Sequence, residues 1–162
     1  DHKGVIIVAN KSDVAGEEIP SYRETFRTQV EREFHFFTDV PIVFTSAKTG
    51  AGINELFKTI EAVSLKLNYK ISTSDLNDFF FETIRKAPAP VYGITNVKFY
   101  YLTQTNQVPP SFIAFANHPD GVTNSYRRFL IKNMKEKFNL HGIPIRIFCM
   151  KSSSKNKSSG EG

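Results

Sequence analysis

Hydrophobic residues in the first part of the chain follow two patterns, which predict alternating strands and helices. Residues 5–9 form an unbroken apolar run, and residues 41–45 form a second run that is rich in β-branched side chains. Short unbroken runs are typical of strands buried on both faces of a parallel sheet. Apolar residues then recur at helical spacing over 21–37 and 53–67. Since a helix connects the two strands, we expect them to be parallel neighbours.

The pattern changes after residue 70 to helix, strand, strand, helix, strand. Ser72 is a predicted helix N-cap, with Asp75 placed as the acid of a capping box, and the helix should end near Lys86, before two prolines. The other elements are predicted at residues 97–104, 112–117, 123–138 and 143–149. This order indicates a three-stranded sheet with both helices packed on one face.

Composition narrows the class of protein. The 162 residues, 40% of them hydrophobic, suit one or two small domains. No apolar run is long enough to cross a bilayer and no signal-peptide pattern opens the sequence, so we expect a cytoplasmic protein without a membrane partner. The single cysteine, Cys149, lies in a strand pattern and is expected to be a buried, inert thiol. The four histidines have no ligand spacing, so we expect no metal site.

Charge is uneven between the two parts. Residues 1–70 hold nine Lys/Arg and ten Asp/Glu, whereas residues 71–162 hold twelve and six and so carry a charge of +6. The basic part favours a polyanionic partner. Residues 152–162 are a Lys/Ser/Gly tail that we expect to be disordered.

Two groups of side chains in the basic part are candidates for RNA or ribosome contact. Arg128, Lys132 and Lys135 recur on one side of the predicted helix at 123–138, next to Arg127, and either bind phosphates or form a solvated face. The aromatic residues of the strands either stack on bases or, for most of them, belong to the core; they are Tyr100, Tyr101, Phe112 and Phe115.

The first predicted strand ends in Asn10-Lys11-Ser12-Asp13, a set of side chains suited to reading guanine. Ligands of parallel sheets bind at the carboxyl ends of strands. Guanine carries two adjacent donors, N1–H and the N2 amine, and the carboxylate of Asp13 can accept from both. Asn10 can bond the base edge or brace the loop, and the stem of Lys11 can lie along the base plane.

The second strand ends in Ser46-Ala47-Lys48, which supplies the other half of such a pocket. The small Ala47 lets its backbone N–H approach guanine O6, and Ser46 can steady Asp13. Gly50 and Gly52 permit a tight turn before the next helix. Each short motif alone also fits a routine loop, but the two in this order, each after a strand, favour a guanine site.

These residues resemble the guanine-recognition motifs of translation-factor-type GTPases. The resemblance implies that GTP or GDP is the ligand and that Asn10, Lys11, Asp13, Ser46, Ala47 and Lys48 form the base site. The sequence ahead of Asn10 holds no phosphate loop and no Mg²⁺ ligand of that family. We therefore expect the rear half of a G domain, inactive as a GTPase by itself.

Several segments of the second part resemble the last domain of the bacterial Der (EngA) GTPases. These are 71–77, 98–104, 109–112, 125–130 and 142–147. The resemblance implies a partial P-loop NTPase-type α/β sheet followed by an α+β KH-like domain of order α-β-β-α-β. It divides the chain into a half G domain at 1–70, a KH-like domain at 71–151 and the tail. It also implies upstream G domains of the same chain, and the large ribosomal subunit or its precursor as a partner.

The resemblance leaves one rival open. This rival is a non-enzymatic RNA- or protein-binding module whose first segment is a structural remnant. The Gly-x-x-Gly loop with which ordinary KH domains clamp a nucleic-acid backbone is absent between the central elements of the second part. Binding of ribosomal RNA by residues 71–151 alone would favour this rival.

Overall fold

The structure is a computed structural model, and it describes residues 3–14, 19–33 and 39–152. Contacts divide the chain into two compact units. Unit 1 comprises Asp1–Tyr69, Gln107–Pro110 and Lys135–Ile145, and unit 2 comprises Lys70–Asn106, Ser111–Met134 and Arg146–Gly162. The division of the chain at residues 70 and 151 remains a prediction.

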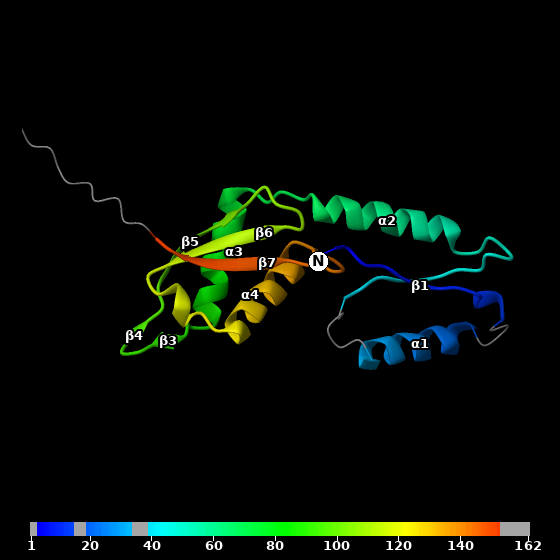
Figure 1. Cartoon of the computed structure of the whole chain (residues 1–162), viewed down its shortest axis with the longest axis horizontal. Helices are drawn as coiled ribbons and strands as arrows, with labels where there is room; N and C mark the ends of the chain where they lie inside the picture. The colour runs from blue at the N-terminus through cyan, green and yellow to red at the C-terminus, as the bar shows by residue number, and fades with distance from the viewer. Residues whose placement is uncertain (1–2, 15–18, 34–38, 153–162) are drawn as a thin grey trace, which may run out of the picture. The chain divides into compact units, whose positions relative to one another are not determined.

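Unit 1 is built on two parallel strands with a helix after each (Figure 1). The strands β1 (Ile7–Ala9) and β2 (Ile42–Phe44) pair in the register Ile7↔Ile42. The helices are α1 (Ile19–Glu33) and α2 (Ile53–Leu67). The predicted order and the parallel pairing are confirmed, although the sheet has only two strands among the described residues.

The two strands of unit 1 differ in burial. Val43 and Phe44 point to opposite faces of β2 and are both buried, which fits a strand covered on both sides. Aromatic contacts join Phe44 to α1, through Tyr22 at 6.0 Å and Phe26 at 5.6 Å between ring centroids.

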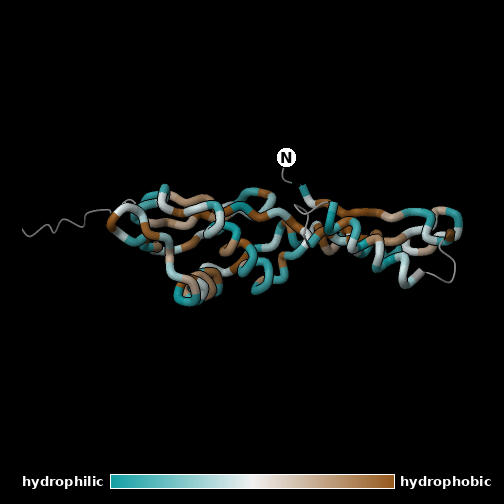
Figure 2. The backbone as a smooth tube through the Cα atoms, turned by 90° about the horizontal axis from the view of Figure 1, so that it is seen from below, coloured by the Kyte–Doolittle hydropathy of each residue, from teal (hydrophilic) through white to brown (hydrophobic). Residues whose placement is uncertain are grey.

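The prediction of full burial is wrong for β1, where Val8 is 45% exposed. The apolar run that enters this strand is drawn brown in Figure 2. Exposed apolar side chains also occur on α2, at Phe57 and Ile60. The physical reason is that the described part of unit 1 holds too few elements to cover all of its apolar side chains.

Unit 2 contains the predicted helix, strand, strand, helix, strand order. Its elements are α3 (Thr73–Lys86), β5 (Phe99–Gln104), β6 (Ser111–Ala116), α4 (Asn124–Lys137) and β7 (Arg146–Lys151). The strands form one sheet in the order β5-β6-β7, with β6 antiparallel to β5 and parallel to β7. The whole chain is therefore a mixed α/β protein with small sheets.

The helices of unit 2 bury one face of this sheet. Phe99 packs between Phe80 of α3, at 5.3 Å, and Tyr126 of α4, at 5.9 Å between ring centroids. Leu102 and Ala114 are paired residues of β5 and β6 on the same face, and neither is exposed to solvent. The core of unit 2 thus lies between this face and the two helices.

Local hydrogen bonds explain where α3 begins and how the edge of β5 is closed. The predicted N-cap is confirmed, because Ser72 Oγ accepts from the backbone N of Asp75 at 3.1 Å and donates to its carboxylate at 2.7 Å. From α3, the side-chain amide of Asn77 donates to the carbonyl of Leu102 and accepts from its N–H, at 3.0 and 2.9 Å. This amide occupies the place of a neighbouring strand and so protects the edge.

One feature of unit 2 is absent from the sequence prediction. A hairpin of β3 (Val91–Tyr92) and β4 (Thr95–Asn96) turns at Gly93, whose φ is +62°. Gly121, in the short 3₁₀ helix η2 (Pro119–Gly121), leaves room for Tyr92, since a Cβ there would lie 2.7 Å from the Tyr92 Cβ. The sequence signal for this hairpin was Gly93 between Val91-Tyr92 and Ile94-Thr95, which are β-branched or aromatic.

Candidate functional site

The two predicted base-reading loops lie side by side in unit 1. Because β1 and β2 are parallel and in register, their carboxyl ends open on one edge of the sheet. Backbone hydrogen bonds continue the pairing into the loops, from Thr45 N to the carbonyl of Ala9 at 2.9 Å and from Ser12 N to that of Thr45 at 3.0 Å. The expectation that the two motifs meet is confirmed.

Asp13 is held by Ser46. Ser46 Oγ donates to Asp13 Oδ1 at 2.6 Å and accepts from the backbone N of Thr49 at 3.3 Å. Ser46 is only 1% exposed, whereas the Asp13 side chain lies at the surface. A buried hydroxyl therefore orients a carboxylate that remains accessible to a ligand, as the sequence predicted.

Asn10 braces the loops in this structure. Its Oδ1 accepts from the backbone N of Lys11 at 2.8 Å and from that of Ala47 at 3.2 Å, and lies 3.5 Å from Thr45 Oγ1. Of the two roles considered for Asn10, the structure thus shows the bracing one. Ala47 N–H, expected to face a base carbonyl, is directed at Asn10. A base would have to share this donor or displace Asn10 from it.

Backbone geometry fixes the turn from the second loop into α2. Gly52 has a φ of +76°, and a Cβ on it would collide with the carbonyl oxygen of Phe44. Ser46 N donates to the carbonyl of Ala51 at 2.9 Å, and Gly50 N donates to that of Ser46 at 2.8 Å. Glycine at position 52 is therefore required for the close approach that holds Ser46 under Asp13.

The two lysines of the motifs, Lys11 and Lys48, are exposed at the rim of this site. Lys11 has a φ of +64°, an uncommon value for a residue with a side chain. The arrangement thus presents an oriented carboxylate flanked by two exposed cations. Chemically, the carboxylate can accept two hydrogen bonds from a planar ligand.

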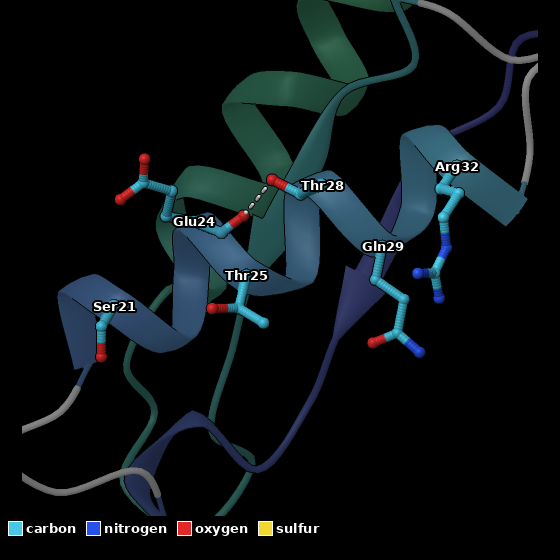
Figure 3. A pocket seen from close by; sticks show the side chains of 6 residues that line it. All are labelled: Ser21, Glu24, Thr25, Thr28, Gln29 and Arg32. Carbon is cyan, nitrogen blue, oxygen red and sulfur yellow. Dashed lines mark hydrogen bonds between the residues drawn. The ribbon is translucent and has the colours of Figure 1, made fainter.

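A hollow of ≈ 590 Å³ lies elsewhere in unit 1, along α1 (Figure 3). It is lined by exposed polar side chains of that single helix, which are Ser21, Glu24, Thr25, Thr28, Gln29 and Arg32. None of the predicted base-site residues lines it. Since one exposed helix surface encloses no ligand, we assign the hollow no function.

The four candidate RNA-contacting residues of α4 and its surroundings are not equivalent. Arg128 and Lys132 are exposed. Lys135 instead lies in unit 1, with Nζ 3.2 Å from Asp39 Oδ2 and a side chain 19% exposed. Arg127 is half-buried beside the thiol of Cys149. Two of the four are thus engaged by other parts of the protein.

Cys149 is half-buried, where a buried thiol was expected. Burial raises the pKa of Cys149, and the nearby Arg127 guanidinium opposes this effect. A raised pKa leaves less thiolate at neutral pH. Across the parts of the chain that the structure describes, no His, Cys, Asp and Glu side chains gather as a metal site, and no helix is long and apolar enough to cross a membrane.

Comparison with known proteins gives one consistent relationship. Residues 70–149 match the model of the KH-domain-like family of EngA bacterial GTPase enzymes, C-terminal. The chain is 39% identical over 145 residues, 90% of its length, to GTPase Der of Geobacter metallireducens, and 36% identical over 149 residues, 92% of its length, to GTPase Der of Lactobacillus johnsonii. It covers 33% and 34% of these two relatives, so it spans about a third of the length of the curated relatives it matches.

Proposed function

The chain belongs to the family of EngA bacterial GTPases, whose C-terminal KH-domain-like part matches residues 70–149, and from this premise we propose that it reads the guanine base of GTP or GDP and contacts the large ribosomal subunit. The first role belongs to residues 1–70, the rear of a P-loop NTPase-type G domain. The second belongs to the KH-like residues 71–151. The chain works with upstream G domains of the same polypeptide.

The contact between Ser46 and Asp13 is the observation that carries the guanine role. It orients one carboxylate oxygen toward the protein and leaves the side chain accessible. Guanine N1–H and N2–H₂ donate to that carboxylate, whereas adenine lacks this pair of donors. Each hydrogen bond to a charged group contributes about 1.5–3 kcal/mol to the binding free energy. Asp13 is therefore the residue that selects the base.

The other motif residues support this role. Asn10 keeps the two loops together through the backbone N–H of Ala47, which is next to the position where guanine O6 would accept a hydrogen bond. The stems of Lys11 and Lys48 cover the faces of the base. The guanine base of GTP or GDP fits the chemistry of these residues. The sequence contains no motif that would bind the phosphates of the nucleotide or Mg²⁺.

Hydrolysis of GTP to GDP is accordingly a property of the whole parent protein. Catalysis of phosphoryl transfer depends on phosphate positioning and Mg²⁺ electrostatics, and we assign no residue of this chain to it. This chain contributes the site that binds the guanine base of the nucleotide. Nucleotide state then changes how the G and KH-like domains pack.

The ribosomal role rests on charge. The +6 charge of residues 71–162 and the exposed Arg128 and Lys132 on α4 favour contact with RNA phosphates. The rival function is a non-enzymatic RNA- or protein-binding module in which the Asn10 and Ser46 loops no longer bind nucleotide. Base selectivity distinguishes the two, because a remnant has no reason to prefer guanine.

We test the base site by nuclear magnetic resonance on the ¹⁵N-labelled chain. Titration with GDP should shift the amide signals of Asn10, Asp13 and Ala47 at millimolar concentrations, since phosphate contacts are missing. ADP at equal concentration is the matched control and should leave these signals in place. Equal shifts with both nucleotides, or shifts confined to other residues, would refute guanine recognition.

A further inference from the structure

The three-stranded sheet of unit 2 has a second face that the helices do not cover. Residues facing away from the core form two rows across the strands, set by the pairing Tyr101↔Phe115↔Met150 and Thr103↔Ile113↔Phe148. Three of these side chains are markedly exposed, with values of 43% for Tyr101, 44% for Phe148 and 49% for Met150. We call these six residues the outer sheet face.

The outer sheet face presents aromatic rings at one end. Tyr101 and Phe115 stack on each other across neighbouring strands, with ring centroids 4.4 Å apart and an interplanar angle of 23°. A bulge between Phe99 and Tyr101 frees Tyr100 from the ladder, and Tyr100 is 42% exposed. Flat, fixed rings on a sheet are platforms on which nucleobases stack, since every base has a π-face.

A positive charge lies at the same end. Lys98 precedes β5 with Nζ 5.9 Å from the centre of the Tyr100 ring. It is exposed and belongs to none of the ion pairs found within the described residues. Lys151, at the end of β7, lies in the row of the buried Phe99 and Ala116 and so on the covered side of the sheet. The sequences of β5, β6 and β7 contain no Asp or Glu. The charge of this end therefore complements phosphate rather than an acidic neighbour.

We propose that the outer sheet face binds single-stranded RNA, with bases stacked on Tyr101 and Phe115 and a phosphate bound by Lys98. This inference deepens the proposed ribosomal contact and rests on it for the choice of RNA. It places base recognition on the strands, while Arg128 and Lys132 of α4 supply phosphate contacts at most. Exposed stacked rings beside a lysine, on strands without a carboxylate, match the bases and phosphates of RNA.

The proposal is tested with the complete chain and a fluorescein-labelled ten-nucleotide oligouridine in low salt. Replacing both rings, Tyr101→Ser with Phe115→Ser, should weaken binding about tenfold or more, because stacking on aromatic side chains supplies much of single-strand affinity. Phe81→Ala is the matched control, since Phe81 is 41% exposed but lies on α3, on the covered side of the sheet. It should leave binding unchanged.

A second variant keeps the test independent of folding. Lys98→Glu leaves the rings in place and should lower the dependence of affinity on salt, since each phosphate contact contributes about 0.9 to the slope for duplex DNA and about 0.7 for single strands. Circular dichroism confirms that each variant is folded. Wild-type affinity in both folded variants, or an equal loss with Phe81→Ala, would overturn the proposal.

Binding to purified large ribosomal subunits, measured by co-sedimentation, separates this proposal from the proposed function. If the wild-type chain binds subunits and the ring variant binds them equally well, the outer sheet face is not the RNA site but the ribosomal role stands. If the wild-type chain binds oligouridine through the rings but no subunits, the ribosomal role fails and the RNA site stands. Loss of subunit binding in the ring variant alone supports both.

Discussion

Replacement of Gly52 by alanine tests whether the geometry of the second loop is as demanding as the structure indicates. Two costs arise at this position. A residue with a side chain loses about 1–2 kcal/mol in the left-handed region, and the φ of Gly52 is +76°. In addition, the new Cβ collides with the Phe44 carbonyl and lies 3.1 Å from Thr45 Cα, so backbone must move, which costs about 1–3 kcal/mol.

Gly50 offers a matched control. Its φ of +78° carries the same conformational cost, but a Cβ there meets nothing within 4 Å. Alanine also restricts the unfolded chain, which offsets about 0.4–1 kcal/mol in both variants. We therefore expect Gly50→Ala to lower the free energy of unfolding by about 1 kcal/mol and Gly52→Ala by about 3 kcal/mol.

Urea unfolding followed by circular dichroism measures both values, because ΔG falls linearly with urea concentration. The difference in free energy of unfolding between the two variants gives the cost of the clash, because both variants share the same conformational cost. If Gly52→Ala and Gly50→Ala destabilise the chain equally, the backbone around Phe44 yields without cost. The loop would then not hold Ser46 rigidly under Asp13, and the reasoning for an oriented carboxylate would fail.

Three further predictions concern activity, charge and pH. The chain alone should show no Mg²⁺-dependent phosphate release from GTP, and turnover above background would contradict the assignment of catalysis to other parts of the parent. Arg128→Glu with Lys132→Glu should weaken co-sedimentation with large ribosomal subunits in a salt-dependent manner while changing stability by about 0.5 kcal/mol or less; unchanged binding would make α4 a solvated face. Burial raises the pKa of Tyr126 above its usual 10.0, so its contribution to stability is complete below that pH and declines as pH rises through the raised pKa. Above pH 10, the free energy of unfolding of Tyr126→Phe should therefore fall less steeply with pH than that of the wild type, as measured by urea unfolding.

Local patterns were enough to predict the order of elements and the meeting of the two loops. The strand-helix-strand pattern fixes the parallel pairing, and parallel pairing alone brings Asn10 and Ser46 to one edge. The N-cap of α3 was predictable because Ser72 and Asp75 bond each other within one turn. These features depend on residues close in sequence or on a rule of chain topology.

Features that depend on long-range contacts could not be predicted. The ion pair of Lys135 with Asp39 joins residues 96 positions apart, so a charge that looked solvated on a helical face is half-buried. Alternation of side chains along the strands showed that the sheet has two faces, but not which face is exposed to solvent. Phe112 is buried completely, while Tyr101 is exposed. The exposure of Val8 was missed because an apolar run does not reveal how many elements cover it.

Exchange of Asp13 for asparagine tests most directly whether this residue reads the base. The measurement is competitive binding of GTP and xanthosine triphosphate to a longer protein that joins this segment to a phosphate-binding loop. Asp13→Asn replaces an acceptor by a donor, so it repels the guanine amine and pairs with the carbonyl that xanthine has in its place. Preference should therefore shift toward xanthosine triphosphate by about a hundredfold or more. Equal weakening toward both nucleotides would mean that Asp13 only holds the loops together, and would contradict its role in selecting guanine.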